Sequence, residues 1–513
     1  MKTPPLVKSR AKAMGVLSPA RKAAFEILMA VERGQTHSDE LLRTKAVNSL
    51  PTADRNLATS LVLGVLRWQI HLDHQLHSLL KRPNGKLDPE IRIALRLGAF
   101  QLLHLDRIPA RAAIDESVEL AKQSGHKFAS GMVNAVLRKL AAAPNDTNGL
   151  REPKALQPLV ALDTPCAAER ASAGQEVSGH GFSRAESPAE KTGALAPEAT
   201  PSALAIAQAH PLWMVERWVR FYGLEATRDL CRHGQSQPVL TVRLEDRTVE
   251  TELAKDAIYL EPGELLTAAR SVLSGDIVAT PAFKAGRIRL QDEGSQLVAE
   301  LAGQGSAILD CCAAPGGKTL ILAERNPQAR ILACDSSSTR CEQLRLRLAP
   351  LGDRVECRLV DAATLEEESV FDLALVDVPC SGTGTLGRNP EIRHRLRLEE
   401  LPRQAKRQQE ILTAALRAVR PGGRVVYSTC SLEPEENEQV VAAVLAATPG
   451  ARIVSLQPRL DAMLAQGILV PEAAQGLRDS LTAEGTLRLL PGAFHTDGFF
   501  VALIQKTESP DGL

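Results

Sequence analysis

Apolar side chains recur at three- to four-residue intervals through the first quarter of the chain, which predicts helices. Phe25, Leu28 and Val31 share one face of a segment that starts after Ser18-Pro19 and ends before Gly34. A serine followed by a proline is typical of a helix start and a glycine of its end, so Ser18 is expected to cap this helix. The same spacing predicts further helices at about 54–68, 71–80, 88–104, 110–123 and 127–142. Residues 18–143 are therefore expected to form an all-helical domain.

The periodicity stops at residues 144–208, where Ala, Pro, Gly, Ser and Glu dominate. Such a segment buries too little apolar surface to offset the entropy lost on ordering, so a flexible low-complexity insertion is expected. Helical spacing returns at about 210–223 and 225–233, and a strand-like run follows at 239–244. Residues 209–285 are therefore expected to form a small α/β subdomain.

From residue 286 onward, short β-branched runs alternate with amphipathic segments. Strands are expected at 306–310, 330–334, 354–359, 371–377 and 423–428, and helices at about 318–325, 339–350, 402–419 and 435–447. This alternation predicts a Rossmann-like, mostly parallel, doubly wound sheet over residues 286–508. Two late apolar runs, 485–490 and 498–505, predict an antiparallel addition at one edge.

Charge is distributed unevenly along a chain that has no net charge. The first 140 residues carry 22 Lys and Arg against 12 Asp and Glu, and residues 1–17 form a basic tail. Excess positive charge of this kind favours nucleic acid as a partner, although a solvated helical surface has the same composition. Because aromatic residues make up only 3% of the chain, phosphate contacts should dominate over base stacking. The first candidates for RNA contact in this region are Arg10, Lys12, Arg21 and Lys22.

The composition argues against several other classes of protein. No run of about 18 apolar residues is present, and residues 1–22 lack the apolar core of a signal peptide. The nine cysteines include no C-x-x-C motif, which disfavours a disulfide framework or a zinc ribbon. We therefore expect a cytoplasmic, metal-free protein that acts as a monomer.

A glycine-rich segment, Cys311-Cys-Ala-Ala-Pro-Gly-Gly-Lys318, follows the first strand of the predicted sheet. Its glycines let the backbone approach a ligand, and the helix start behind them favours a carboxylate or phosphate. A Walker-type phosphate loop is disfavoured, because its first glycine would fall at Cys312.

Acidic residues end the strands of this region, where parallel sheets gather their ligands. Asp335 is placed to meet a ribose diol, and Asp361 an adenine amine. Together with Asp310 and Asp377, they would repel a pyrophosphate and suit a cofactor with a positive centre. S-adenosylmethionine, with a cationic sulfonium, fits this description.

Two cysteines, Cys380 and Cys430, each end a β-branched run and lie in turns of Ser, Gly and Thr. Most cysteines in strand-like segments are small buried hydrophobes. That interpretation is applied to Cys311, Cys312, Cys334, Cys341 and Cys357. Two thiols in polar turns instead favour covalent catalysis, in which one attacks and a second group helps to release the product. The residues alone do not say which cysteine attacks.

Three segments closely resemble the RNA cytosine-5 methyltransferases of the RsmB/Nop/Sun family: Asp310–Thr319, Asp377–Gly384 and Tyr427–Ser431. The helical domain resembles the NusB-type RNA-binding fold, and this fusion is similar to the family's 16S ribosomal RNA methyltransferases. The resemblance covers about 18–143 and 209–507. It implies a class I methyltransferase fold with S-adenosylmethionine as cofactor. It also implies methylation of cytosine C5 in 16S ribosomal RNA, before or during subunit assembly, through a covalent adduct of a cysteine with C6.

By this resemblance Cys430 would be the nucleophile, Cys380 would assist release, and Asp377 would face the cytosine. The residues that would bind the cofactor are Cys312, Ala313, Ala314, Pro315, Gly316, Gly317, Lys318, Asp335, Asp361 and Asp377. The chain departs from the family pattern at Val378, where alanine is usual, and in a basic stretch after Thr383 that lacks an aromatic residue. The basic residues of that stretch are expected to line the mouth of the site, although a solvated run of charge has the same composition: Arg388, Arg393, Arg395 and Arg397.

Two other functions remain open from the sequence. A cytosine-5 methyltransferase of transfer RNA would share the same catalytic core. A non-catalytic RNA-binding factor for ribosome assembly or antitermination would use the helical domain alone.

Overall fold

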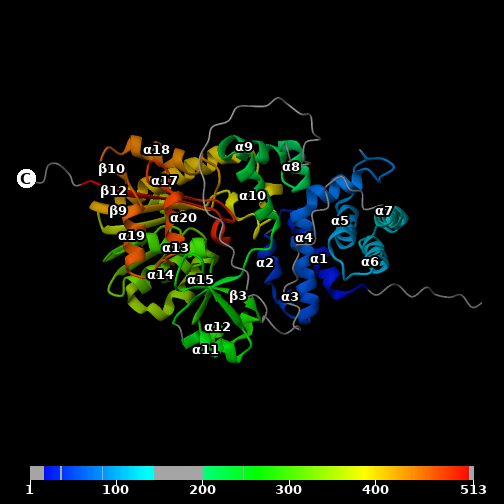
Figure 1. Ribbon diagram of the computed structural model, residues 1–513, viewed down its shortest axis with the longest axis horizontal. Helices are drawn as coiled ribbons and strands as arrows, with labels where there is room; N and C mark the ends of the chain where they lie inside the picture. Colours follow the sequence, from blue (N-terminus) through cyan, green and yellow to red (C-terminus); the bar gives the residue numbers. More distant parts are fainter. Residues whose placement is uncertain (1–16, 35–36, 84, 144–199, 247, 508–513) are drawn as a thin grey trace, which may run out of the picture.

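The computed structural model describes residues 17–34, 37–83, 85–143, 200–246 and 248–507 of the chain. A helical N-terminal domain lies beside a larger α/β domain (Figure 1). The basic tail, with Arg10 and Lys12, and residues 144–199 of the expected insertion lie outside the described residues.

The N-terminal domain is helical, as expected. Its helices are α1 (Pro19–Glu32), α2 (Ser38–Leu42), α3 (Lys45–Asn48), α4 (Thr52–His77), α5 (Pro89–His104), α6 (Ala110–Gln123), the 3-10 turn η1 (Lys127–Ala129) and α7 (Ser130–Ala142). The prediction of two helices at 54–68 and 71–80 is wrong, because no glycine or proline interrupts α4 between them. Ser18 is the N-cap residue of α1 and Pro19 its first residue, as predicted, but the Ser18 hydroxyl donates to Glu116 at 2.7 Å and makes no capping hydrogen bond with the helix.

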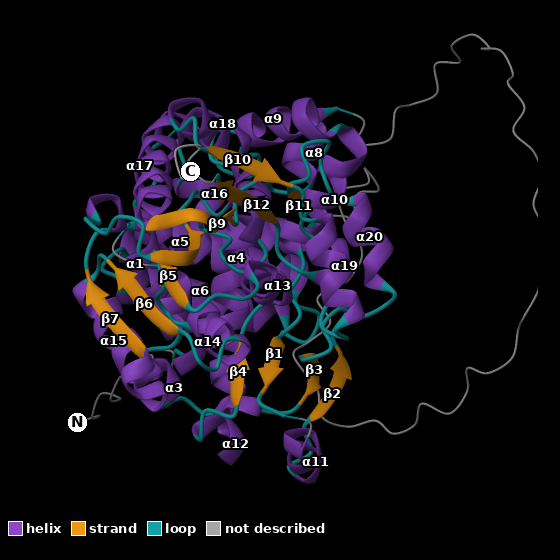
Figure 2. Cartoon of the chain, turned by 90° about the vertical axis from the view of Figure 1, so that its left-hand side faces the viewer, coloured by secondary structure: helices purple, strands orange, loops and turns teal. Residues whose placement is uncertain are grey.

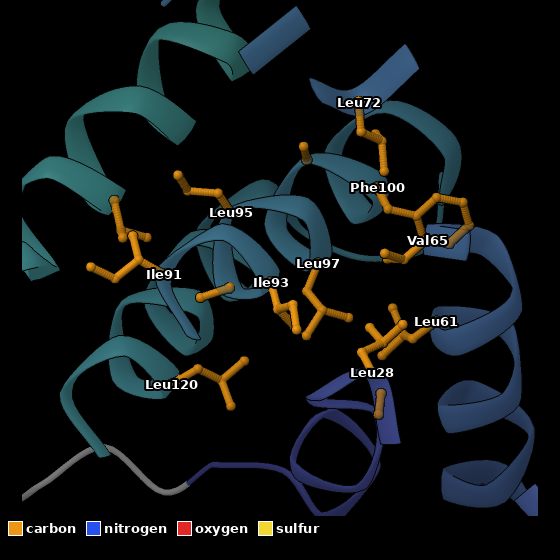
Figure 3. Close-up of a cluster of buried hydrophobic side chains, with 14 of the residues drawn as sticks. Leu28, Leu61, Val65, Leu72, Ile91, Ile93, Leu95, Leu97, Phe100 and Leu120 are labelled. Atoms are coloured by element: carbon orange, nitrogen blue, oxygen red, sulfur yellow. The ribbon is translucent and has the colours of Figure 1, made fainter. Parts of the chain in front are cut away.

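One continuous apolar core holds these helices together. Leu28 of α1, Leu61 and Val65 of α4, and Phe100 of α5 point into the same cluster (Figure 3). Close packing is visible at Gly64, where an added Cβ would lie 1.9 Å from the Phe100 ring. A core of this kind lets the domain fold as a unit and present its outer surface to a partner.

Three helices connect this domain with the rest of the chain: α8 (Pro201–Ala207), α9 (Leu212–Tyr222) and α10 (Leu224–Gln235). The expectation of a flexible segment up to residue 208 is wrong for α8. The Thr200 hydroxyl caps α8 by accepting from the Ala203 N–H, and Leu204 packs into one cluster with Met214 and Trp218. The Ala- and Pro-rich composition of this segment does not indicate a helix, and α8 forms because tertiary burial stabilises it.

A four-stranded antiparallel sheet follows, in the order β2 (Tyr259–Pro262), β3 (Ala269–Ser274), β1 (Thr241–Leu244) and β4 (Ile288–Leu290). The helices α11 (Thr248–Lys255) and α12 (Pro281–Lys284) and the turn η2 (Ile277–Ala279) accompany it. Because β4 pairs with β1, the subdomain ends after β4 rather than at residue 285. Arg243 of β1 is fully buried and donates to Glu300 and Glu324 of the following domain, which fixes the two against each other.

The C-terminal domain is built on an eight-stranded sheet (Figure 2). Its strands are β5 (Ala307–Asp310), β6 (Arg330–Asp335), β7 (Val355–Leu359), β8 (Phe371–Asp377), β9 (Val419–Thr429), β10 (Ala451–Val454), β11 (Leu487–Leu489) and β12 (Phe499–Lys506). The order is β10-β12-β9-β8-β5-β6-β7, and β11 pairs with β12. From β9 to β7 all neighbours are parallel, whereas β12 runs antiparallel to β9. The predicted doubly wound sheet and its antiparallel addition are confirmed.

Helices cover both faces of this sheet. They are α13 (Glu293–Ala302), α14 (Gly317–Arg325), α15 (Ser338–Leu348), α16 (Ile392–Arg395), α17 (Leu401–Ala418), α18 (Glu438–Ala447), α19 (Gln457–Ala465) and α20 (Ala473–Asp479), with the short turns η3 (Ala349–Arg354), η4 (Ala362–Thr364), η5 (Thr383–Thr385), η6 (Leu398–Glu400) and η7 (Ala493–His495). Alternate residues of one strand face opposite cores: Leu373 packs with α13 and α14, and Ala374 packs with α17 and α18. Both faces are thus covered, and the carboxyl ends of the parallel strands are left for ligands.

No described helix is long and apolar enough to cross a membrane. Within the described ranges, no group of three or more His, Cys, Asp or Glu side chains is arranged to hold a metal ion.

Candidate active site

The glycine-rich loop turns sharply between β5 and α14. Gly316 adopts a φ of +97°, and a Cβ there would lie 3.0 Å from Leu344. Glycine is therefore required both by the backbone conformation and by the space. Two arginines of α15 brace the loop from outside: Arg340 donates to the Ala314 carbonyl and Arg347 to the Pro315 carbonyl, each at 2.9 Å.

A cavity of about 260 Å³ opens beside this loop at the carboxyl ends of the strands. Its lining residues are Cys311, Cys312, Ala314, Asp335, Ser336, Arg340, Asp361, Ala362, Asp377, Val378, Pro379, Cys380, Arg407, Ile411 and Cys430. Five of the ten residues expected at a cofactor line it: Cys312, Ala314, Asp335, Asp361 and Asp377. Ala313, Pro315, Gly316, Gly317 and Lys318 shape the loop or support the wall instead.

The acids of the cavity have basic partners that the sequence did not indicate. Asp335 lies 3.3 Å from Arg340, and Asp361 forms an ion pair with Arg407. These arginines come from α15 and α17, outside any recognisable motif. The field in the cavity is therefore less negative than a simple count of carboxylates suggests.

Asp377 is held from two sides at the end of β8. Lys318 Nζ lies 2.7 Å from Oδ2, and the Ser428 hydroxyl donates to Oδ1 at 2.7 Å. Burial opposes the positive charge of Lys318, but the Asp377 carboxylate outweighs it and raises the pKa of the ammonium. Asp377 is thereby fixed in one orientation on the cavity wall.

The two polar-turn cysteines meet at the cavity. Cys380 Sγ lies 3.4 Å from Cys430 Sγ, within hydrogen-bond distance for sulfur. The hydrogen bond with Cys430, together with burial, raises the pKa of the Cys380 thiol well above its usual value. A Cys380 thiol that keeps its proton can donate a hydrogen bond to Cys430 Sγ.

The other cysteines behave mostly as the sequence predicted. Cys311, Cys334 and Cys341 are buried, and burial raises the pKa of Cys311 and Cys334. Cys312 and Cys357 depart from the expectation of a buried hydrophobe, because both are partly exposed, Cys312 on the cavity wall.

The Cys430 loop (residues 430–437) is anchored to helix α9. The Tyr222 hydroxyl donates to the Leu432 carbonyl, and Trp218 Nε1 donates to Glu433 at 3.1 Å. Arg217 binds Glu433 at 2.9 Å. Helix α9 therefore helps to position this thiol.

The expectation that the basic stretch after Cys380 contacts RNA is wrong for three of its four arginines. Arg393 is 1% exposed and donates to main-chain carbonyls, including that of Gly234 at 2.8 Å. Arg388 bridges Asp292 and Asp497, and Arg395 donates to the Val31 carbonyl. Arg397 remains exposed.

This stretch instead docks the N-terminal domain onto the catalytic domain. Arg67 of α4 donates to the Gly387 carbonyl at 2.7 Å, and Ser38 of α2 donates through its N–H and its hydroxyl to Glu391. Arg21, an expected RNA contact, is likewise buried and paired with Glu116, whereas Lys22 is exposed. Buried arginines bound to carbonyls serve the interface between domains and are not available to RNA.

Asp310 gives the stability of the protein a defined pH dependence. It ends β5, is buried, and accepts a hydrogen bond from Thr319 at 2.7 Å. Burial, and to a smaller extent the charge of Asp377, raises the pKa of Asp310 to about 7. An unfolded aspartate titrates near pH 4, roughly, so between the two values only the folded state holds the proton. The free energy of unfolding should therefore fall as the pH rises from about 4 to above 7.

Substituting Asp310→Asn should flatten this fall, because the amide does not titrate. The measurement is the melting temperature at pH 5.5 and pH 8, with Asp353→Asn, an exposed position, as the matched control. An unchanged difference between the two pH values in Asp310→Asn would show that another group causes the loss.

Comparison with known proteins identifies the family to which the chain belongs. The profile described as 16S rRNA methyltransferase RsmB/F matches residues 299–505, and the NusB family profile matches residues 18–142. The chain is 31% identical over 505 residues to "Probable ribosomal RNA small subunit methyltransferase B" of Synechocystis sp., covering 95% of this chain and 99% of that protein. It is 30% identical over 504 residues to the protein of the same name from Bacillus subtilis, covering 95% and 98%. The chain belongs to the RsmB/F family.

Membership of the RsmB/F family makes this chain an S-adenosylmethionine-dependent methyltransferase with a NusB-type domain in front of the catalytic domain. The crystal structure of PH0851 superimposes with a TM-score of 0.70 over 96% of this chain and 100% of that chain. At 22% identity this likeness concerns the fold alone. The cavity fits the cofactor of the RsmB/F family, since a glycine turn and three strand-end carboxylates surround it.

Proposed function

We propose that this chain transfers a methyl group from S-adenosylmethionine to C5 of a cytosine in 16S ribosomal RNA, through a covalent adduct between Cys430 and C6. The observation that carries the proposal is the pair of thiols, 3.4 Å apart, on the wall of a cavity that also holds Asp377. Cytosine C5 is a weak nucleophile, and addition of a thiolate to C6 makes it enamine-like. Release of such an adduct needs a second group beside the nucleophile, and a neighbouring thiol can serve as that group.

Cys430 is assigned as the attacking thiol. Its Sγ forms the bond to C6, and the electrons of the C5=C6 double bond move towards N3 and O2 of the ring. The resemblance of Tyr427–Ser431 to the Thr-Cys motif of the family supports this assignment, and the Cys380 thiol lies 3.4 Å away, where it can donate a hydrogen bond to Cys430 Sγ. S-adenosylmethionine, when bound, supplies the methyl group that C5 accepts.

Cys380 is assigned to release. After methylation, C5 loses its proton to a base, the C5=C6 double bond reforms, and the bond between Cys430 Sγ and C6 breaks with its electron pair on sulfur. A thiol at 3.4 Å that donates to this sulfur stabilises the leaving thiolate.

Asp377 and Lys318 are assigned to the cytosine side of the cavity. The fixed carboxylate can accept a hydrogen bond from the N3 proton or the exocyclic amine of the adduct. The partly buried Lys318 ammonium lies 2.7 Å from that carboxylate and helps to fix its orientation. Asp335 and Asp361 would meet the ribose and the adenine of the cofactor, with Cys312 and Ala314 beside them. Ala313, Pro315, Gly316, Gly317 and Lys318 would hold the loop that carries them.

Methyl transfer to protein-free 16S RNA tests the proposal. The chain is incubated with labelled S-adenosylmethionine and either 16S RNA or transfer RNA, and bisulfite sequencing locates the product. We expect label in 16S RNA at a cytosine that resists bisulfite. Label confined to transfer RNA would support the alternative substrate, and label at a position other than cytosine C5 would contradict the chemistry.

A surface on the N-terminal domain supports RNA as the substrate. Phe128 is 80% exposed in the turn before α7, next to Lys127. The low aromatic content of the chain had predicted that phosphate contacts dominate over base stacking. An exposed ring beside a cation suits stacking on an unpaired base.

Phe128→Ala should weaken RNA binding about tenfold, since one stacked base contributes about 1–3 kcal/mol. Leu346, 75% exposed on α15, offers the matched control Leu346→Ala. Fluorescence anisotropy with a labelled 16S fragment measures both dissociation constants. Equal affinity for Phe128→Ala and the wild-type chain would remove this residue from the RNA surface.

A further inference from the structure

A buried carboxylate joins the loops that carry the two thiols. Glu436 is 0% exposed and lies at the end of the Cys430 loop. Its Oε1 accepts from the Ser381 N–H at 2.8 Å and from Gln408 at 3.0 Å. Its Oε2 accepts from the hydroxyls of Ser381 and Ser431, the second at 2.5 Å.

The arrangement around Glu436 is nearly symmetric. Ser381 directly follows Cys380, and Ser431 directly follows Cys430. Their hydroxyl oxygens lie 3.0 Å apart and converge on the same carboxylate oxygen. The two loops come from the ends of neighbouring parallel strands, β8 and β9, so this carboxylate bridges them just beyond the sheet hydrogen bonds.

Glu436 has no basic partner among the ion pairs of the described residues, in contrast to Asp335, Asp361 and Asp377. Burying a carboxylate is costly unless hydrogen bonds replace its water. Four donors do so here, and all of them belong to the loops or to Gln408, which also donates to the Pro379 carbonyl. The hydrogen bonds of the Glu436 carboxylate therefore all hold the loops, or Gln408 beside them, in place.

We propose that Glu436 is a positioning residue that holds Cys380 within hydrogen-bond distance of Cys430, so that the methylated base can be released. This inference rests on the proposed function and extends it. Two other hydrogen bonds join the loops, from the Gly384 N–H to the Cys430 carbonyl and from the Leu432 N–H to the Thr383 hydroxyl, each at 2.9 Å. Glu436 binds the residue that directly follows each thiol, so without it the Cys380 side chain could move relative to Cys430, which it touches only through one weak sulfur contact. A shift of about 1 Å at such a contact can cost roughly a hundredfold in rate.

Glu436→Gln tests the inference, with Glu435→Gln as the matched control. Glu435 precedes it in the loop but is partly exposed, pairs with Arg217 at 2.7 Å, and makes no hydrogen bond with the Cys380 loop among the described contacts. Glu436→Gln should lower kcat by about tenfold or more, leave the KM for S-adenosylmethionine within about twofold, and raise the steady-state fraction of enzyme linked to ordinary RNA. Glu435→Gln should match the wild-type chain in all three.

The distance between the thiols is measured separately with phenylarsine oxide, which binds two neighbouring thiols at once. We expect the wild-type chain to bind it, Cys380→Ala to lose this binding, and Glu436→Gln to bind about tenfold more weakly. If Glu436→Gln does not fold, the double variant Ser381→Ala with Ser431→Ala removes the two hydroxyl donors and should give the same results.

The outcomes separate this inference from the proposed function. If the wild-type chain forms no covalent adduct with RNA, the proposed function fails. If the wild-type chain forms the adduct but Glu436→Gln behaves like Glu435→Gln, only the positioning role fails. If Glu436→Gln lowers kcat but neither raises the adduct fraction nor weakens phenylarsine oxide binding, the positioning role also fails. Glu436 would then affect the rate without changing the distance between the thiols.

Discussion

Replacing Cys430 with alanine is expected to lower methyl transfer to RNA by at least about 10³-fold and to abolish the covalent adduct. Without the sulfur, nothing adds to C6, and C5 remains too weak a nucleophile to accept the methyl group. The change should leave the fold intact, because the side chain is only partly buried and alanine fills most of its volume.

Two assays on the same samples check this expectation. One measures initial rates with labelled S-adenosylmethionine, and the other measures the protein–RNA adduct on a denaturing gel with RNA that contains 5-fluorocytosine. Cys357→Ala, a partly exposed thiol outside the cavity, is the matched control and should retain full activity. Substantial methylation by Cys430→Ala would remove Cys430 from the nucleophile position.

Replacing Cys380 with alanine is expected to have a different outcome: turnover falls by about a hundredfold or more while the adduct accumulates on ordinary RNA. Its thiol keeps its proton and lies 3.4 Å from Cys430 Sγ, so it stabilises the thiolate that leaves C6. Cys380→Ala leaves the Cys430 sulfur that attacks C6 in place, so the adduct should still form.

Cys380→Ser separates the hydrogen bond from the sulfur. A hydroxyl can still donate to Cys430, so this variant should release product faster than Cys380→Ala and show less adduct. The adduct is measured by intact-protein mass spectrometry during turnover. If neither variant accumulates adduct, Cys380 has no part in release.

The elements around the site were predictable because their signals are local. A glycine turn after a strand, acids at strand ends and cysteines in polar turns all lie within a few residues of the features that determine them. Parallel strands bring their carboxyl ends to one edge of the sheet, so Cys380 and Cys430 were expected on the ligand side, and their direct contact follows from β8 and β9 being neighbours.

What the sequence missed depends on packing between distant segments. Arg340 and Arg407 reach the cavity from helices whose orientation no short motif determines. Arg393 was expected to line the mouth of the site, yet it is buried against main-chain carbonyls of α4 in the N-terminal domain and of the segment around α10. Glu436 looked like one of several acids near a helix start, and only the convergence of two loops distinguishes it.

The same limit applies to the fold. The helix α8 has a composition typical of low complexity and exists because α9 offers it an apolar surface. The prediction of separate helices at 54–68 and 71–80 was wrong, because no residue between them breaks the single helix α4. Local patterns thus predicted the class of each domain, and tertiary burial decided the boundaries.

The most direct test of the account is to identify the residue that is linked to the target base. The wild-type chain is incubated with S-adenosylmethionine and 16S RNA containing 5-fluorocytosine, whose fluorine blocks release, and the trapped complex is digested and mapped by mass spectrometry. The account predicts a nucleotide on the peptide that contains Cys430. A nucleotide on the Cys380 peptide, or methylation of ordinary RNA with no trapped complex at all, would contradict it.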